Sequence, residues 1–155
     1  MIRVTALIAA LMLLPLVAVA KDAIILKTAV LKIDNGPVLP LSRLDLPAEN
    51  DGFAGAAVGL ADNNTTGRFL GQTFEATEVT AKPEDAIKAA EVAVADGAGV
   101  IVALAPEATL LALADHFADQ NTIILNATAR DDALRNASCR ANVLHVAPSR
   151  AMLAD

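Results

Sequence analysis

Residues 74–104, FEATEVTAKPEDAIKAAEVAVADGAGVIVAL, decide the fold class. The stretch begins with an alternating apolar and polar run at residues 74–79, which is typical of a half-buried strand. Residues 83–85, Pro-Glu-Asp, have the order that opens a helix, and Gly97 marks the end of that helix. Residues 100–104 are continuously apolar, as in a strand covered on both faces. A strand, a helix and a buried strand in this order predict a parallel βαβ unit.

The same alternation of elements continues on both sides of this unit. Residues 28–33 form a β-rich run before an Asp-Asn-Gly-Pro turn, and apolar residues recur at helical spacing over 47–60. Another helix is expected to begin at Pro106, and further strands are expected at residues 122–125 and 142–146. This order predicts the α/β class, with a doubly wound parallel sheet in one Rossmann-like lobe.

Five glycines lie in or near the first expected helix. Gly52, Gly55 and Gly59 weaken helix propensity, so we expect them where that helix approaches the sheet closely. Gly67 and Gly71 are expected to form a turn between this helix and the next strand. Phosphate-binding glycines instead follow a strand and open a helix, and no Walker lysine or GxGxxG motif is present. The sequence therefore predicts no nucleotide cofactor.

The first 20 residues have the three parts of an export signal. Arg3 supplies the positive charge, residues 6–17 the apolar core, and residues 18–20 a small-residue cleavage site. A transmembrane anchor fits less well, because the apolar run is short of a full span and lacks a basic flank. We expect residues 1–20 to be a signal peptide that is removed near Ala20 on export.

The remainder has the pattern of one lobe followed by the beginning of a further helix. Residues 21–147 are long enough to bury a core of their own. At residues 148–155 a Pro-Ser pair is expected to start a helix, with Ser149 as its cap. Since Asp155 ends this helix after about two turns, we expect the chain to be truncated.

Charge and cysteine content restrict the partners. The formal net charge is −6 and no basic stripe is present, so we expect no nucleic-acid partner. The single cysteine, Cys139, cannot form an internal disulfide. We expect its thiol to be buried, as free cysteines usually are.

No arrangement of residues predicts a catalytic or metal site. His116 and His145 do not lie at ligand spacing from another histidine or cysteine, and no GxSxG nucleophile motif occurs. His116 is expected on the rim of a helix and His145 in a strand. The Asp131–Asp132 pair could serve a metal or an acid/base mechanism, but it is more typical of a solvated helix start.

The fold predicts where a ligand binds, which is at the carboxyl ends of the parallel strands. Polar side chains and helix starts gather there in the loops after the first, third and fourth strands of the expected sheet. The alternative for each polar residue is a local role as a turn, cap or solvated side chain. The candidate ligand-binding residues are Ser42, Arg43, Ala105, Asn126, Ala127 and Thr128.

Several segments resemble the type I periplasmic binding proteins, especially their branched-chain amino-acid branch. Residues 61–75 (ADNNTTGRFLGQTFE) stand where that class has a glycine turn between a helix and a strand. Residues 98–104 stand for its buried strand, and residues 123–130 (IILNATAR) for its strand with a polar loop.

Three stretches are similar to a narrower group, the binding components of ABC importers associated with pyrroloquinoline-quinone (PQQ)-dependent alcohol catabolism. These are PLSRLDLP at 40–47, ADNNTTGRFLGQ at 61–72 and CRANVLHVAPSRAMLAD at 139–155. The resemblance covers essentially the whole chain after the signal.

The resemblance implies a non-enzymatic receptor in the periplasm, without a cofactor, that closes two lobes over a small solute. It implies delivery of the solute to ABC permease subunits in the inner membrane, and a link to the PQQ-dependent dehydrogenase pathway. Residues 148–155 would then begin the crossover into a second lobe. In this sequence the loop after the third strand contains Pro106, which has no backbone N–H and so disfavours a free amino acid as ligand.

Two other classes of function stay open from the sequence. The first is an exported α/β hydrolase whose catalytic residues lie further along a longer chain. The second is a sensor or interaction module that uses the same lobe without transport.

Overall fold

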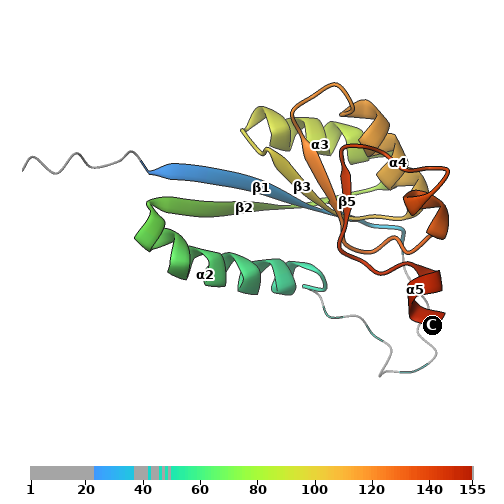
Figure 1. Cartoon of the computed structure of the whole chain (residues 1–155), viewed down its shortest axis with the longest axis horizontal. Helices are drawn as coiled ribbons and strands as arrows, with labels where there is room; N and C mark the ends of the chain where they lie inside the picture. The colour runs from blue at the N-terminus through green and yellow to red at the C-terminus, as the bar shows by residue number, and fades with distance from the viewer. Residues whose placement is uncertain (1–22, 37–41, 43–45, 47, 49, 155) are drawn as a thin grey trace, which may run out of the picture.

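A parallel five-stranded sheet forms the centre of the molecule (Figure 1). The computed structural model describes residues 23–36, 42, 46, 48 and 50–154. The strand order is β2-β1-β3-β4-β5, and every neighbouring pair is parallel. The strands are β1 (Ile24–Ile33), β2 (Gln72–Ala81), β3 (Val100–Leu104), β4 (Ile123–Asn126) and β5 (Val143–His145). The predicted α/β class and parallel sheet are confirmed.

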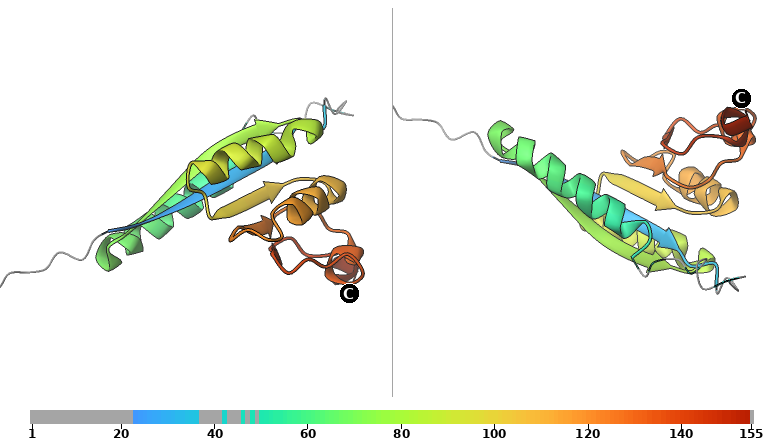
Figure 2. Two further views of the ribbon diagram at one scale, coloured as in Figure 1. Left: turned by 90° about the horizontal axis from the view of Figure 1, so that it is seen from above. Right: turned by 90° about the horizontal axis from the view of Figure 1, so that it is seen from below.

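Helices connect each strand to the next or follow the last strand. They are α2 (Phe53–Leu70), α3 (Ala86–Ala95), α4 (Glu107–His116) and α5 (Arg150–Ala154), with short 3₁₀ helices η2 (Pro83–Asp85) and η3 (Asp132–Arg135). Helix α2 lies on one face of the sheet, and α3 and α4 lie on the other (Figure 2). The chain therefore winds in both directions from β1, as the sequence predicts.

The core lies between the sheet and helices α3 and α4. Small residues of α3, including Ala86 and Ala90, are buried there and allow the helix to lie close to the strands. From α4 and the residue after it, Leu110 and Phe117 fill the space over β3 and β4. Leu113 is also fully buried, whereas Leu111 is only partly buried.

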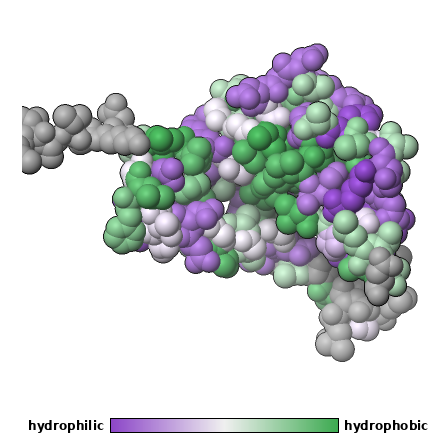
Figure 3. Space-filling model, viewed as in Figure 1, coloured by the Kyte–Doolittle hydropathy of each residue, from purple (hydrophilic) through white to green (hydrophobic). Residues whose placement is uncertain are grey.

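The second face of the sheet, on which α2 lies, is covered unevenly. Helix α2 packs along β2, and Val30 on the same face of β1 is buried. Further along the sheet, Ile123 of β4, Leu144 of β5 and the following Val146 are exposed at 43, 55 and 70%. Apolar side chains accordingly gather on the surface in Figure 3.

The turn expected around Gly67 is wrong, because α2 continues through that region to Leu70. Gly71 alone forms the turn, with a left-handed φ of 68° that ends the helix. The residues before Gly67 have low helix propensity, but Asn64 compensates through tertiary bonds. Its Nδ2 donates to the Phe74 carbonyl, and its Oδ1 accepts the Phe74 N–H, both at 2.9 Å. The side-chain amide thus provides hydrogen-bond partners for the Phe74 N–H and C=O groups on the outer side of β2, which is an edge strand of the sheet.

The close approach expected at Gly55 and Gly59 is also wrong. Both glycines are exposed, and a Cβ added to either would meet no atom within 4 Å. Gly52 does lie against another residue, since an added Cβ would come within 2.5 Å of the Leu104 side chain. Among the glycines of α2, the close approach to another backbone is instead at Gly67, where an added Cβ would lie 2.7 Å from the Gln72 carbonyl oxygen.

The helix ends predicted for α3 and α5 agree with the structure. Pro83 opens η2, which continues into α3, and Gly97 follows the helix with a φ of 102°. The Ser149 hydroxyl accepts the Met152 N–H at 3.3 Å, as a helix cap does. The signal peptide and the expected start of the first helix at Pro47 lie outside the described residues.

Cys139 is exposed, so the burial predicted for its thiol is wrong. It lies in the loop between η3 and β5, and the buried side chains of this region are Leu134 of η3 and Val143 of β5. Across the part of the chain that the structure describes, no helix is both long and apolar enough to cross a bilayer.

The contact at Gly67 can be tested with a matched pair of variants on α2. We expect Gly67→Ala to lower the free energy of unfolding by about 1–3 kcal/mol, since the new methyl group overlaps the backbone of β2. Gly59→Ala, in open space on the same helix, should raise it by up to about 1 kcal/mol. Urea unfolding followed by circular dichroism measures both values. Equal effects of the two substitutions would contradict the packing described.

Candidate functional site

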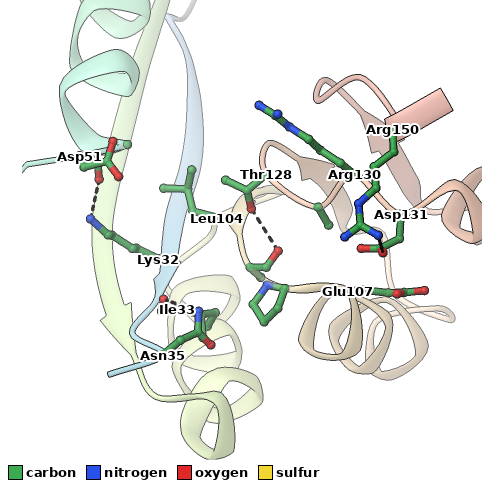
Figure 4. A pocket seen from close by; sticks show the side chains of 14 residues that line it. Lys32, Ile33, Asn35, Asp51, Leu104, Glu107, Thr128, Arg130, Asp131 and Arg150 are labelled. Carbon is green, nitrogen blue, oxygen red and sulfur yellow. Dashed lines mark hydrogen bonds and ion pairs between the residues drawn. The ribbon is translucent and has the colours of Figure 1, made fainter. Parts of the chain in front are cut away.

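A pocket of about 530 Å³ opens at the carboxyl ends of β1, β3 and β4 (Figure 4). Ile33 lines it from β1, Leu104 and Glu107 from the end of β3 and the start of α4, and Thr128 from the loop after β4. The pocket lies where the chain winds in opposite directions from β1 and β3, which is where α/β sheets bind ligands. Its volume is in the range of small-molecule sites.

The wall on the β1 side is fixed by a contact with the chain before α2. Lys32 Nζ donates to the Asp51 carbonyl oxygen at 2.8 Å and lies 5.8 Å from the Phe53 ring centre. Asn35 follows the strand, and its side chain turns back to the Ile33 carbonyl oxygen at 3.4 Å. These contacts tie the start of α2 to the end of β1 and give this wall a lysine and an amide (Figure 4).

The opposite wall is the loop after β4, which the fully buried Asn126 holds in place. Asn126 Oδ1 accepts the N–H groups of Thr128 and Ala129 at 3.2 and 2.9 Å. Its Nδ2 donates to the Ala129 carbonyl oxygen at 2.7 Å and contacts His145 Nδ1 at 3.0 Å. Thr128 Oγ1 donates to the Ala105 carbonyl oxygen at 3.0 Å, which joins this loop to the end of β3.

Three charged side chains complete the rim on this side. Asp131 and Arg150 form an ion pair at 3.1 Å, and the Arg150 N–H bonds the Arg130 carbonyl oxygen at 2.9 Å. The Arg130 side chain extends over the pocket and has no hydrogen bond or ion pair with any described residue (Figure 4). The pocket thus has an exposed guanidinium group on its rim, and it is also lined by the start of α4, whose first backbone N–H groups favour negative charge.

The neighbouring carboxylate, Asp132, holds α5 against this loop. It accepts the Ala151 N–H at 3.0 Å, and hydrogen bonds from Ser149 and from Ala151 lower the pKa of Asp132. Asp131 and Asp132 therefore begin η3 and anchor α5, in agreement with the predicted helix start. Among the described residues, no three His, Cys, Asp or Glu side chains come together as a metal site would require.

Comparison with solved structures finds a similar fold. The chain aligns with the leucine-, isoleucine-, valine-, threonine- and alanine-binding protein from Brucella ovis in its closed conformation, with a TM-score of 0.62 and 20% identity. The alignment covers 84% of this chain and 33% of that protein. The fold is that of one lobe of a type I periplasmic binding protein. The chain spans about one third of the length of this structural relative.

Sequence comparisons add no closer relationship. No protein-family model matches the chain, and no curated protein matches it.

The structure brings some of the predicted site residues together and separates others. Ala105 and Thr128 line the pocket, whereas the fully buried Asn126 lies beneath the loop and Ala127 is not part of the lining. Ser42 is exposed and does not line the pocket, and Arg43 lies outside the described residues.

The sequence interpretation missed several of the residues that line the pocket. Lys32 could have been found as a lysine within the apolar run of β1, and Asn35 as a polar residue directly after that strand. Arg130 follows Thr128 closely in the same strand-end loop. Asp51 gives no such signal, because a connection between strand and helix brings it back to Lys32.

Asn126 can be tested through the stability of the lobe. Asn126→Ala leaves the Thr128 and Ala129 N–H groups without their acceptor, so we expect a loss of about 2–4 kcal/mol in the free energy of unfolding. Asn63→Ala, at an exposed position of α2, is the control and should change stability by less than about 0.5 kcal/mol. Chemical denaturation at neutral pH measures both. A loss at Asn126 no greater than that at Asn63 would show that the loop does not depend on this amide.

Proposed function

We propose that the chain is a solute-binding lobe of a periplasmic receptor, which captures a small polar molecule between this lobe and a second one. The observation that carries the proposal is the pocket between β1, β3 and β4, which opens along the strand-end edge of the lobe. A second lobe closing over this edge would complete the enclosure of the solute. The exposed apolar side chains on the second face of the sheet are consistent with further chain covering this lobe.

The side chains around the pocket favour a solute with an anionic group. Arg130 is unpaired among the described residues, whereas Lys32 donates to the Asp51 backbone carbonyl and Arg150 is ion-paired with Asp131. A guanidinium group binds carboxylates through paired hydrogen bonds, and the start of α4 adds a favourable dipole.

The remaining parts of the proposal rest on the sequence resemblance. The receptor would be exported through the signal at residues 1–20 and would deliver its solute to ABC permease subunits in the inner membrane. Its solute would be linked to PQQ-dependent alcohol oxidation. The structural relative, which binds leucine, isoleucine, valine, threonine and alanine, supports a binding role at this type of lobe.

The two histidines of this lobe are engaged away from the pocket. His116 Nε2 lies 2.9 Å from a Glu91 carboxylate oxygen on the outer surface of α3 and α4, and His145 is engaged with Asn126. Neither lines the pocket at the strand ends.

Arg130 provides the test of the proposed solute class. A thermal-shift screen with short-chain carboxylates and their matched amides should find a carboxylate that raises the melting temperature when its amide does not. For that ligand we expect Arg130→Gln to weaken binding roughly tenfold or more, because it removes a charged hydrogen-bond donor. Titration calorimetry measures the affinity.

Arg68→Gln is the control, since Arg68 lies near the far end of α2 and does not line the pocket. It should leave the affinity unchanged. A screen in which no carboxylate binds, or an Arg130→Gln variant that binds as tightly as the wild type, would count against an anionic solute at this pocket.

A further inference from the structure

The hydrogen bonds of Asn126 determine the protonation of a second, partly buried residue, His145. Asn126 Oδ1 faces two backbone N–H groups, those of Thr128 and Ala129, so this atom can only be the acceptor. The other amide atom faces the Ala129 carbonyl oxygen, so it can only be the donor nitrogen. Because this nitrogen also lies 3.0 Å from His145 Nδ1, that ring nitrogen must accept and cannot carry a proton.

The second ring nitrogen of His145 is buried without a partner. Nε2 has no hydrogen bond to any described atom. The hollow beside the ring, lined by Leu110, Leu134 and Val143 among others, has no space for a water molecule. The neutral ring therefore carries its proton on Nε2, and no hydrogen bond at that nitrogen offsets the loss of the Asn126 bond when the ring becomes charged.

The charged groups around the ring also oppose a positive charge. Burial and the Arg135 guanidinium lower the pKa of His145, whereas the Leu134 backbone favours the charged form weakly. Arg140, which also lines the hollow, is a second cation, although its charge is paired with Asp115 of α4. The other residues facing the ring from α4 are Leu110 and Leu111, which carry no charge.

Protonation of His145 cannot be accommodated by rotating the Asn126 amide. A proton on Nδ1 would face the Asn126 amide nitrogen, which is also a donor. Rotating the amide by half a turn would present Oδ1 to the ring, but it would turn the nitrogen toward the N–H groups of Thr128 and Ala129. One side of Asn126 must therefore lose its bonds when the ring becomes charged.

We propose that neutral His145 is a positioning residue for the strand-end pocket: through Asn126 it fixes residues 127–129, and its protonation releases this loop and weakens solute binding. The coupling between His145 and the loop stands on the hydrogen bonds alone. Its effect on affinity rests on the proposed function. The solute would thus be held at neutral pH and released more readily in acid.

The coupling is tested first without any ligand. Nitrogen-15 and carbon-13 NMR of the purified protein should show His145 protonated at Nε2 near neutral pH. On acidification, the amide signals of Thr128 and Ala129 should shift with the same midpoint as the His145 ring. A ring protonated at Nδ1, or loop amides that do not follow its titration, would overturn the proposal.

Two variants separate this coupling from general effects of acid. His145→Asn places a carbonyl oxygen near the position of Nδ1, so it keeps an acceptor for Asn126 but cannot titrate. The loop amides should then lose their acid-dependent shift, and they should keep it in His116→Asn, whose histidine is on the surface. If His145→Asn does not fold, the tautomer and the midpoints in the wild type still decide the matter.

The pH dependence of the free energy of unfolding gives an independent test, and the direction of the expected change is defined. The pKa of His145 is lower in the folded protein than in the unfolded chain, so the unfolded chain binds the proton more readily. The contribution of neutral His145 to the free energy of unfolding is complete above the ordinary histidine pKa of about 6.5. It is lost as the pH falls from there through the pKa of His145 in the folded protein. The wild type should lose stability relative to His145→Asn over that range, and a constant difference would overturn the proposal.

Affinity then tests the consequence for the solute. With a carboxylate found by the screen, the dissociation constant of the wild type should rise toward tenfold for each pH unit below the His145 midpoint, because only the neutral form is competent. The constant for His145→Asn should change much less. An unchanged wild-type affinity through the midpoint would overturn the proposed role, whereas failure of every ligand to bind, with the loop still coupled, would count against the proposed function alone.

Discussion

The pairing of β1 with a strand on each side fixes the position of the site. β1 pairs with β2 along its whole length, from Ile24 to Ile33, and with β3 from Thr28 onward. The helices that follow β1 and β3, α2 and α4, lie on opposite faces of the sheet, and the pocket opens at the carboxyl ends of these two strands. The pocket follows from this reversal of winding, because side chains from both strand ends face a gap that the topology leaves open. Its polar rim then depends on which residues happen to follow each strand.

Most of the fold could be predicted because its signals are local. The continuous apolar run of β3 and the Pro-acid start before α3 are each contained within a few neighbouring residues. The continuation of α2 could not be predicted in this way, since the stretch before Gly67 has weak helix propensity. Its stability comes from Asn64, whose partner Phe74 lies on another element. Sequence periodicity does not reveal such a bond.

The candidate site was predictable in its location but only partly in its residues. The rule for strand ends identified Thr128 and Ala105, which do meet at the pocket. The same rule gave Asn126 a role in contact with the ligand, but the chain turns back after β4 and buries this side chain under the loop. Lys32 and Asp51 meet only after the chain has connected β1 to α2, so their contact depends on tertiary structure.

The presence of a polar residue, Asn126, at the base of the loop is explained by the backbone groups to which it hydrogen-bonds. Residues 127–129 turn sharply after β4, and the N–H groups of Thr128 and Ala129 point inward with no strand to accept them. An apolar side chain at position 126 would leave both groups unsatisfied, at a cost larger than that of burying one amide. The asparagine in turn needs an acceptor for its last N–H, and His145 on the neighbouring strand β5 provides it. The network is therefore complete at Asn126 and ends at the unpartnered Nε2 of His145. In this network the only buried side-chain polar atom left unsatisfied among the described residues is one ring nitrogen of His145. The hydrogen bonds of the loop therefore depend most on the charge state of this ring.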